Sequence, residues 1–102
     1  MTESVATLTL QDSRLHLGGV VHFDNAEKVC ADGVKLLKQA GKSLVIDMQE
    51  LASSNSLVVA ILVSWTRIAS SSQQNLHISH MPDKLRAIIS VSGLTTALPE
   101  LP

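Results

Sequence analysis

The chain has 102 residues, of which 45% are hydrophobic, and its formal net charge at pH 7 is −1. A chain of this length can bury one modest core, so we expect a single domain over residues 1–102, with its core at about 5–98 and an irregular tail at 99–102. The apolar content excludes a disordered chain, and the balanced charge leaves no basic surplus to recruit nucleic acid or anionic lipid.

The first residues, MTESVATLTLQD, have neither the basic region nor the apolar region of a secretory signal. No apolar run approaches the roughly 20 residues that span a bilayer. The single cysteine, Cys30, cannot form an internal disulfide, which fits a reducing compartment, and we interpret it as a buried, inert thiol. The sequence therefore predicts a cytoplasmic protein without direct membrane insertion.

Two alternating segments come first along the chain. VATLTLQ (5–11) and RLHLG (14–18) place an apolar residue at every second position, which predicts two half-buried strands in a hairpin that turns through residues 11–13. A helix should follow, with Asp24 as its cap, Glu27 reaching back to it, and Gly41 as its stop. Its apolar residues recur at helical spacing: Ala26, Val29, Cys30, Gly33, Val34 and Leu37.

The middle of the chain predicts a buried strand and a second helix. SLVIDM (43–48) is a continuous apolar run rich in β-branched residues, as expected for a central strand that is covered on both faces. The second helix begins within ASSNSLVVAIL (52–62) and runs to about Ala69. NLHISH (75–80) alternates and predicts a fourth strand.

The last predicted helix starts at Pro82 and ends at Gly93, with Leu94 making the contact that often follows a glycine stop. The remaining TTALPELP (95–102) should be an irregular or frayed end, because its prolines cannot continue a helix. The order of elements predicts a layered α/β domain with a mixed central β-sheet of about four strands and about three helices packed on it.

Enzyme signatures are missing from the sequence: there is no nucleophile elbow, no glycine-rich phosphate loop and no zinc-binding helix motif. His77 and His80 would point to opposite faces of a strand and could not share a metal, and His16 should face solvent. Asp47 and Glu50 follow a strand end, where we interpret them as capping or loop-anchoring groups. We therefore expect no catalytic residue, no metal and no cofactor.

A run of small polar residues leads directly into the second helix. Ser54 or Asn55 can cap the unpaired N–H groups of its first turn, and Ser56 would then lie in that turn. The next two turns, LVVAILV (57–63), contain no polar residue, although a surface helix normally keeps a polar face. Two interpretations follow.

In the first, the helix is enclosed between the sheet and the rest of the fold. In the second, one side packs on the sheet and the other forms an apolar patch that binds a partner. The residues that would form this partner-binding site are Ser54, Asn55, Ser56, Leu57, Ala60 and Ser64.

The element order, together with VIDMQELASSNSLVVAILVSW (45–65) and DKLRAIISVSGL (83–94), resembles a STAS domain, the fold shared by sulfate-transporter tails and anti-sigma-factor antagonists. In that family a strand ending in Asp is followed by Asp-Ser or Asp-Thr and then by an apolar helix. The resemblance covers about residues 5–98. Asp47 matches the strand-ending Asp, Asn55 takes the position of the second Asp, and Ser56 takes that of the Ser or Thr phosphorylated in the antagonists.

The chain departs from the antagonists at two points: Leu57 and Val58 replace small residues, and Asn55 lacks the charge of the second Asp. The apolar junction is instead similar to the STAS subunits of Mla-type ABC transporters, which move phospholipid and maintain outer-membrane lipid asymmetry in Gram-negative bacteria. This resemblance implies a non-catalytic cytoplasmic subunit that binds the transporter ATPase and is thereby held at the inner membrane. The alternative is an anti-sigma-factor antagonist or signalling adaptor, with an anti-sigma factor or serine kinase as partner and Ser56 as phosphoacceptor.

Overall fold

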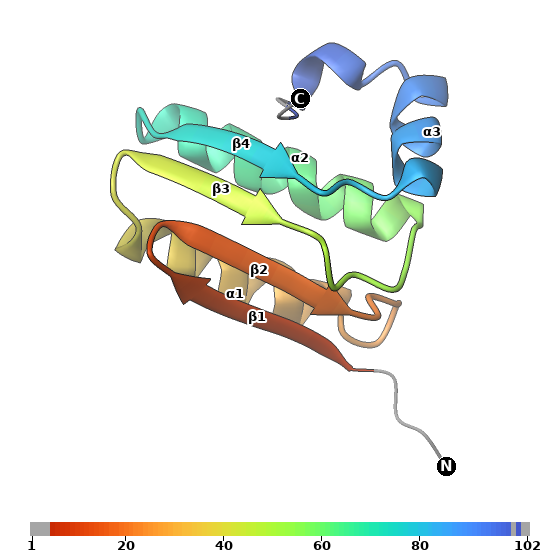
Figure 1. Cartoon of the computed structure of the whole chain (residues 1–102), viewed down its shortest axis with the longest axis horizontal. Coiled ribbons are helices and arrows are strands. Elements are labelled where there is room, and N and C mark those ends of the chain that lie inside the picture. Colours follow the sequence, from red (N-terminus) through yellow and green to blue (C-terminus); the bar gives the residue numbers. More distant parts are fainter. Residues whose placement is uncertain (1–4, 99, 101–102) are drawn as a thin grey trace.

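The computed structural model describes residues 5–98 and 100. Four strands and three α-helices follow one another as the sequence predicts (Figure 1). The elements are β1 (Ala6–Gln11), β2 (Arg14–Gly19), α1 (Ala26–Gln39), β3 (Ser43–Asp47), α2 (Ser56–Ser71), β4 (Asn75–Ser79), α3 (Asp83–Val91) and a short 3-10 helix, η1 (Thr95–Ala97).

The strands form one sheet in the order β1-β2-β3-β4. β1 is antiparallel to β2, whereas β3 is parallel to both β2 and β4, so the predicted mixed sheet is confirmed. The hairpin turns at Asp12 and Ser13, which both have positive φ angles (52° and 64°). Two consecutive left-handed residues match the twist of the flanking strands, and Gln11 and Arg14 form the last pair of the ladder.

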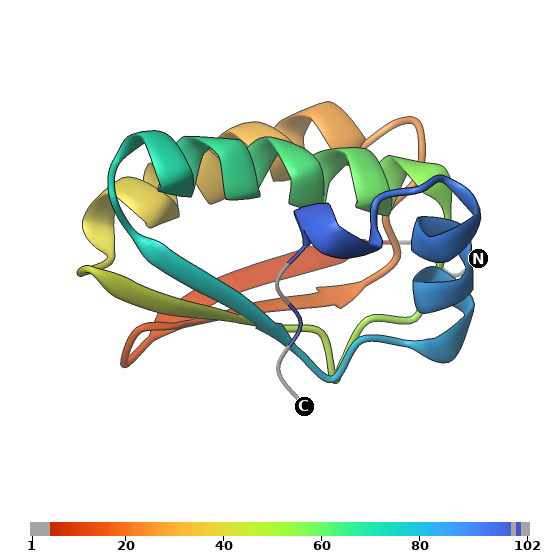
Figure 2. The same ribbon diagram turned by 90° about the horizontal axis from the view of Figure 1, so that it is seen from above.

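α1 and α2 lie side by side on one face of the sheet and leave the other face open (Figure 2). In β3, Leu44 and Ile46 are buried, whereas Val45 between them is only half-buried and pairs in register with Arg14 and His77. The expectation that β3 is covered on both faces is therefore wrong. The β-branched Val45 extends the apolar run without entering the core, because it lies on the open face.

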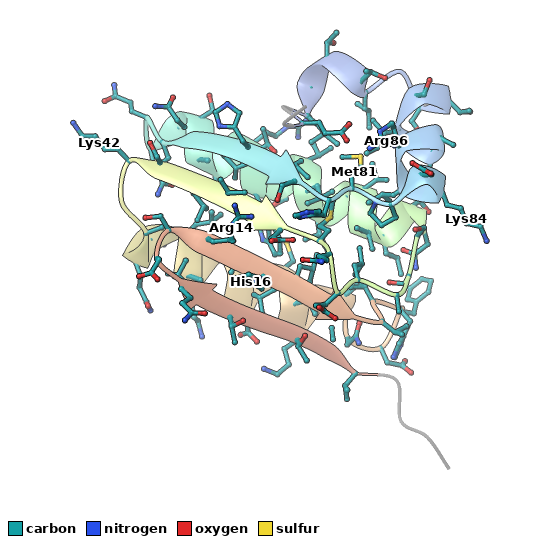
Figure 3. The ribbon with its side chains drawn as sticks, viewed as in Figure 1. Arg14, His16, Lys42, Met81, Lys84 and Arg86 are labelled. Atoms are coloured by element: carbon teal, nitrogen blue, oxygen red, sulfur yellow. The ribbon has the colours of Figure 1, made fainter. Side chains whose placement is uncertain are left out.

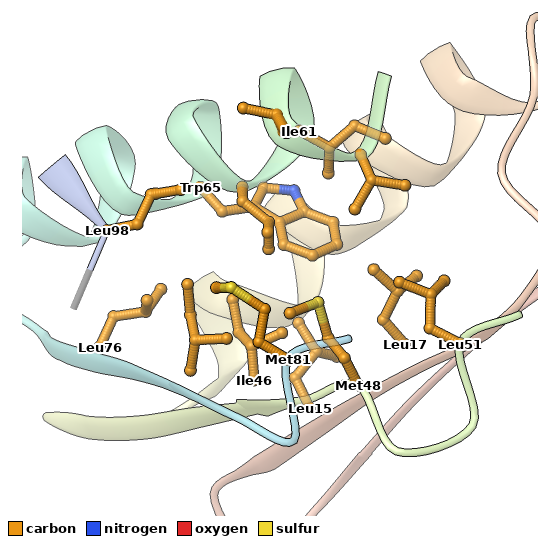
Figure 4. Close-up of a cluster of buried hydrophobic side chains, with 14 of the residues drawn as sticks. Leu15, Leu17, Ile46, Met48, Leu51, Ile61, Trp65, Leu76, Met81 and Leu98 are labelled. Carbon is orange, nitrogen blue, oxygen red and sulfur yellow. The ribbon is translucent and has the colours of Figure 1, made fainter. Parts of the chain in front are cut away.

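Trp65 of α2 is fully buried between the helices and the sheet, above Leu15 and Ile46 (Figure 4). Its indole Nε1 donates a hydrogen bond to the carbonyl oxygen of Cys30 on α1, at 3.0 Å. Gly33 makes room for this ring, because a Cβ at that position would lie 2.1 Å from Cζ2 of Trp65. The contact between α1 and α2 therefore depends on a glycine. The Cys30 side chain is half-buried, so it is less enclosed than predicted.

The predicted ends of α1 are wrong. The residue before the helix is Asn25 and not Asp24, and its side chain bonds to the preceding loop, accepting from the His22 N–H and donating to the Val20 carbonyl, both at 2.9 Å. Glu27 is accordingly the second helical residue. At the other end Ala40 already has extended backbone (φ −77°, ψ 158°), so Gly41 is not the left-handed stop.

The predicted stop of α3 is confirmed. Gly93 has a φ of 72°, and the next N–H, from Leu94, donates to the Ile89 carbonyl at 3.0 Å. The Gly93 N–H donates to the Ser90 carbonyl at 3.1 Å. This pair of bonds is the Schellman arrangement, in which a left-handed residue lets the last carbonyls of the helix find donors.

The described part of the tail packs against the fold, so the expectation of a frayed end is wrong there, and only Thr95–Ala97 form regular structure, a 3-10 helix. Leu98 is 4% exposed and joins the core, and Glu100 forms an isolated bridge with Ile78 of β4. Arg86 of α3 donates from Nε to Glu100 at 3.1 Å. These contacts join segments far apart in the chain. Residues 99, 101 and 102 of the predicted tail lie outside the described residues.

Within residues 5–98 and 100, none of the helices combines the length and the apolar character that crossing a membrane requires.

Candidate protein-binding site at the start of helix α2

Asn55 is the residue that caps α2, with extended backbone (φ −152°, ψ 173°). Its Oδ1 accepts a hydrogen bond from the Val58 N–H at 3.1 Å, and its Nδ2 donates to the Val21 carbonyl at 2.9 Å. Of the two residues predicted as the cap of this helix, Ser54 and Asn55, it is therefore Asn55 that caps it. An aspartate could make the first bond but not the second, because a carboxylate has no donor. This explains the amide at the position where the family's second acid is expected.

The loop before α2 is held against the end of β2. The Ser53 hydroxyl accepts a hydrogen bond from the Val21 N–H at 2.9 Å. Since Asn55 donates to the Val21 carbonyl, both backbone groups of Val21 are bonded to this segment. The Ala52 N–H also donates to the Gly19 carbonyl, at 2.7 Å. Ser53 was missed as a positioning residue, because its partner lies 32 positions away along the chain.

The predicted site residues separate into two groups. Ser56 and Ala60 are exposed and Ser64 is half-buried, and all three line the same surface groove along α2. Leu57 is half-buried and packs against the core, while the half-buried Ser54 lies in the loop before the helix. Among the described residues, one side of α2 therefore covers the sheet and the other is open, as the second interpretation of this helix requires.

A polar cluster lies on the open face of the sheet, where β3 and β4 end. Asp47 is buried; its Oδ2 accepts from Arg14 Nη1 at 2.9 Å, and its Oδ1 accepts from the Gln49 N–H at 2.9 Å and lies 3.1 Å from His80 Nδ1. Burial acts to raise the pKa of Asp47, but the Gln49 N–H, His80 and Arg14 together outweigh it, so that pKa is lowered. The predicted anchoring role of Asp47 is confirmed.

Glu50 is exposed and anchors the loop through its backbone carbonyl, which accepts from the Gly19 N–H at 2.9 Å. His16 is half-buried on the open face, where it lies beside Arg14 on β2 (Figure 3). His77 and His80 were expected to point to opposite faces of one strand. β4 ends at Ser79, however, and His80 has a φ of 57°, so the alternation of side chains along a strand does not apply to His80.

The hydrogen bonds of this cluster hold the strand ends in place and do not form a catalytic arrangement. Ser79 Oγ lies 3.5 Å from His80 Nδ1, the same nitrogen that faces Asp47, so the imidazole does not bridge the serine and the acid as it does in a catalytic triad. Ser79 Oγ instead accepts from Arg14 Nη1 at 3.1 Å. Across residues 5–98 and 100, no group of three or more His, Cys, Asp or Glu side chains could hold a metal ion.

The loop between β2 and α1 carries an exposed aromatic residue that sequence reasoning missed. Phe23 is 88% exposed and follows Val21, the residue bonded to the loop before α2, by two positions. An aromatic residue within a polar loop was the available signal, since the surrounding residues read VHFDN (21–25). Single exposed hydrophobic residues are common on protein surfaces. Phe23 is a candidate contact residue because its loop is bonded, through Val21, to the loop before α2.

Comparison with known proteins gives both sequence and structural matches. A family model described as "Mlab, STAS domain" matches residues 5–100. A search of curated proteins found no match. Among solved structures, the chain is similar to the anti-sigma factor antagonist SpoIIAA in its unphosphorylated form, with a TM-score of 0.71 and 14% identity over 96% of this chain and 89% of that chain.

An anti-sigma factor antagonist from Mycobacterium paratuberculosis has a TM-score of 0.73 and 15% identity over 98% of this chain and 86% of that chain. A variant of RsbS from Moorella thermoacetica has a TM-score of 0.71 and 16% identity over 96% of this chain and 86% of that chain. At these identities the structural likeness shows the fold alone, while the family match covers all of the described residues, 5–98 and 100. STAS domains are generally non-catalytic and act through contacts with other proteins. The chain belongs to this family, described as Mlab, STAS domain.

Proposed function

We propose that the chain is a non-catalytic STAS subunit that binds and supports the ATPase of an Mla-type phospholipid ABC transporter, and so helps to maintain outer-membrane lipid asymmetry. The observation that carries this proposal is the match of residues 5–100 to the family described as Mlab, STAS domain. In this function the protein lies in the cytoplasm, and the transporter complex holds it peripherally at the inner membrane.

The open side of α2 is the surface that we assign to the ATPase. Ser56 and Ala60 are exposed one turn apart, and Asn55 fixes the start of the helix through its bonds to Val58 and Val21. A surface whose backbone is already ordered loses little conformational entropy when it binds. The structure therefore suits a docking role, and the polar cluster around Asp47 supplies no proton relay that would suggest chemistry instead.

A second function is favoured by the position of Ser56. This serine is exposed in the first turn of α2, as a phosphoacceptor must be, and a phosphate is well placed at a helix N-terminus. The chain would then act as an anti-sigma-factor antagonist or signalling adaptor, with an anti-sigma factor or serine kinase as its partner. The neutral Asn55 counts against this alternative, because it removes the charge that the antagonists carry beside the phosphoacceptor.

Binding measurements with purified partners test both functions. The chain is titrated by calorimetry into an Mla-type ATPase subunit and, separately, into a serine-kinase anti-sigma factor, both from the same genome. We expect a complex with the ATPase alone. Binding to the anti-sigma factor together with phosphorylation of Ser56, and no binding to the ATPase, would refute the transporter function in favour of the alternative.

A charge placed on the open side of α2 tests the assigned surface. Ala60→Glu should weaken ATPase binding about tenfold or more, because the acid would lose its water in the contact. Ala31→Glu is the matched control, since Ala31 is an exposed alanine within α1. Leu57→Asp is a less selective probe, because Leu57 is half-buried against the core and its loss would also destabilise the fold. Equal binding by the Ala60 and Ala31 variants would place the interface elsewhere.

A further inference from the structure

We propose that the groove along α2 receives an amphipathic helix of the partner, and that an acidic side chain of this helix pairs with Arg67. The inference rests on the proposed function and specifies the chemistry of the partner's contact segment. The groove has a volume of about 680 Å³ and is lined by Ser56, Val59, Ala60, Val63, Ser64, Arg67, Ile68 and Leu94.

The shape of the groove favours a helix. Its long wall is α2 itself, where Ser56, Ala60 and Ser64 recur every four residues and so lie about 6 Å apart along one side of the helix. Side chains this small let a second helix approach closely, and the rows of side chains at this spacing are the ridges and grooves through which helices pack. A partner helix with apolar residues on one face would cover the wall.

The opposite wall is formed by Leu94, which comes from the turn after α3. Gly93 holds this turn with its φ of 72°, and the Leu94 N–H is bonded to the Ile89 carbonyl at 3.0 Å. Leu94 is half-buried, so part of its side chain remains available on the groove. Hydrogen bonds therefore hold both walls in place: Asn55 fixes the start of α2, and the turn at Gly93 fixes Leu94. Val59, Val63 and Ile68 also line the groove and are apolar.

The charge of the groove selects an acidic partner. Arg67 is the only charged residue that lines it, is exposed, and has no ion pair or side-chain hydrogen bond within residues 5–98 and 100. The positive end of the α2 dipole adds to the same sign at Ser56. A groove with a cation at one end, a positive helix end at the other and no acid between them is complementary to a helix that carries carboxylates.

The test measures the affinity of purified Mla-type ATPase for variants at Arg67. Arg67→Glu should lower the affinity about tenfold or more, whereas Arg67→Lys should keep it within about threefold. Lys38→Glu makes the same charge change at an exposed position of α1 and should bind like the original chain. Thermal melts of the two Arg67 variants should coincide with that of the original chain, because the side chain is exposed. Lys38→Glu should melt slightly lower, because it places an acid in the last turn of α1, and it should still bind like the original chain.

Partner variants complete the test. One acid-to-lysine substitution on a helix of the ATPase should restore binding to the Arg67→Glu variant, which would establish the pair. If Arg67→Glu binds like the original chain while Ala60→Glu does not, the proposed function stands and the acidic helix is refuted. If the original chain does not bind the ATPase, both fail. Hydrogen-exchange protection confined to an extended segment of the ATPase would also refute the helix.

Discussion

Replacing Gly33 by alanine should destabilise the protein, although alanine is the better helix former. The added Cβ would lie 2.1 Å from Cζ2 and 2.3 Å from Cε2 of Trp65, far inside normal contact distance. The indole has no free direction in which to move, because it is fully buried and its Nε1 is bonded to the Cys30 carbonyl at 3.0 Å. Either the ring or α1 must therefore shift.

Three contributions set the magnitude. Overpacking of this kind costs about 1–3 kcal/mol. Displacement of the indole from Cys30 would cost about 1 kcal/mol more, since a buried N–H would lose its acceptor. Replacement of a helical glycine by alanine returns about 1 kcal/mol. The net expectation is a loss of about 1–3 kcal/mol in the free energy of unfolding, or roughly 5–20 °C in Tm for a chain of this size.

Urea denaturation followed by tryptophan fluorescence measures this loss directly, because the chain has one Trp. Gly41→Ala is the matched control: its added Cβ meets nothing within 4 Å, and it should be neutral or stabilising by up to about 1 kcal/mol. Trp65→Phe should reduce the cost of Gly33→Ala in a double-mutant cycle. If Gly33→Ala unfolds at the same urea concentration as the original chain, the close contact between α1 and α2 is refuted.

Three further outcomes are expected. Asn55→Asp keeps the cap but removes the donor to Val21, so urea denaturation should show a loss of about 1 kcal/mol, and equal stability would contradict the dual role. Because the pKa of Asp47 is lowered by folding, its stabilisation is present at neutral pH and is lost as the pH falls below about 4; the deficit of Asp47→Asn should therefore shrink on acidification, and a constant deficit would contradict this. Phe23→Ser should leave the thermal melt unchanged, since the side chain is 88% exposed, but weaken ATPase binding in calorimetry; unchanged binding would remove Phe23 from the interface.

The strands and helices could be predicted from sequence because their signals are local. Alternation marks β1 and β2, and the stop at Gly93 requires only its neighbours in the chain. The error at the start of α1 was local, because Asn25 bonds to His22 and Val20, only three and five positions away. The error in the tail arose from more distant contacts, because Leu98 enters the core and Glu100 meets Arg86. Periodicity records that a residue is apolar but not which distant segment covers it.

The residues of the candidate site likewise include some that local spacing could predict and one that it could not. The row of Ser56, Ala60 and Ser64 could be predicted, because residues four apart on a helix share a side. Arg67, three residues after Ser64, lies on the same side and could also have been predicted, because residues three apart on a helix are neighbours too. Leu94, by contrast, reaches the groove from the turn after α3, and no pattern within α2 indicates it.

Asn55 connects the stability of the fold with the choice between the two functions. Its amide is used twice, once by the Val58 N–H and once by the Val21 carbonyl, so the same side chain caps α2 and ties it to the end of β2. Recognition along the open side of α2 can then use residues that the fold leaves exposed, which include Ser56 in its first turn, Ala60, and Arg67 near its other end. Only one of the three carries a charge, and it is positive. A partner that reads this surface therefore has to supply apolar contact along the helix and a carboxylate at Arg67, and we expect a docking helix of an ATPase to meet both conditions.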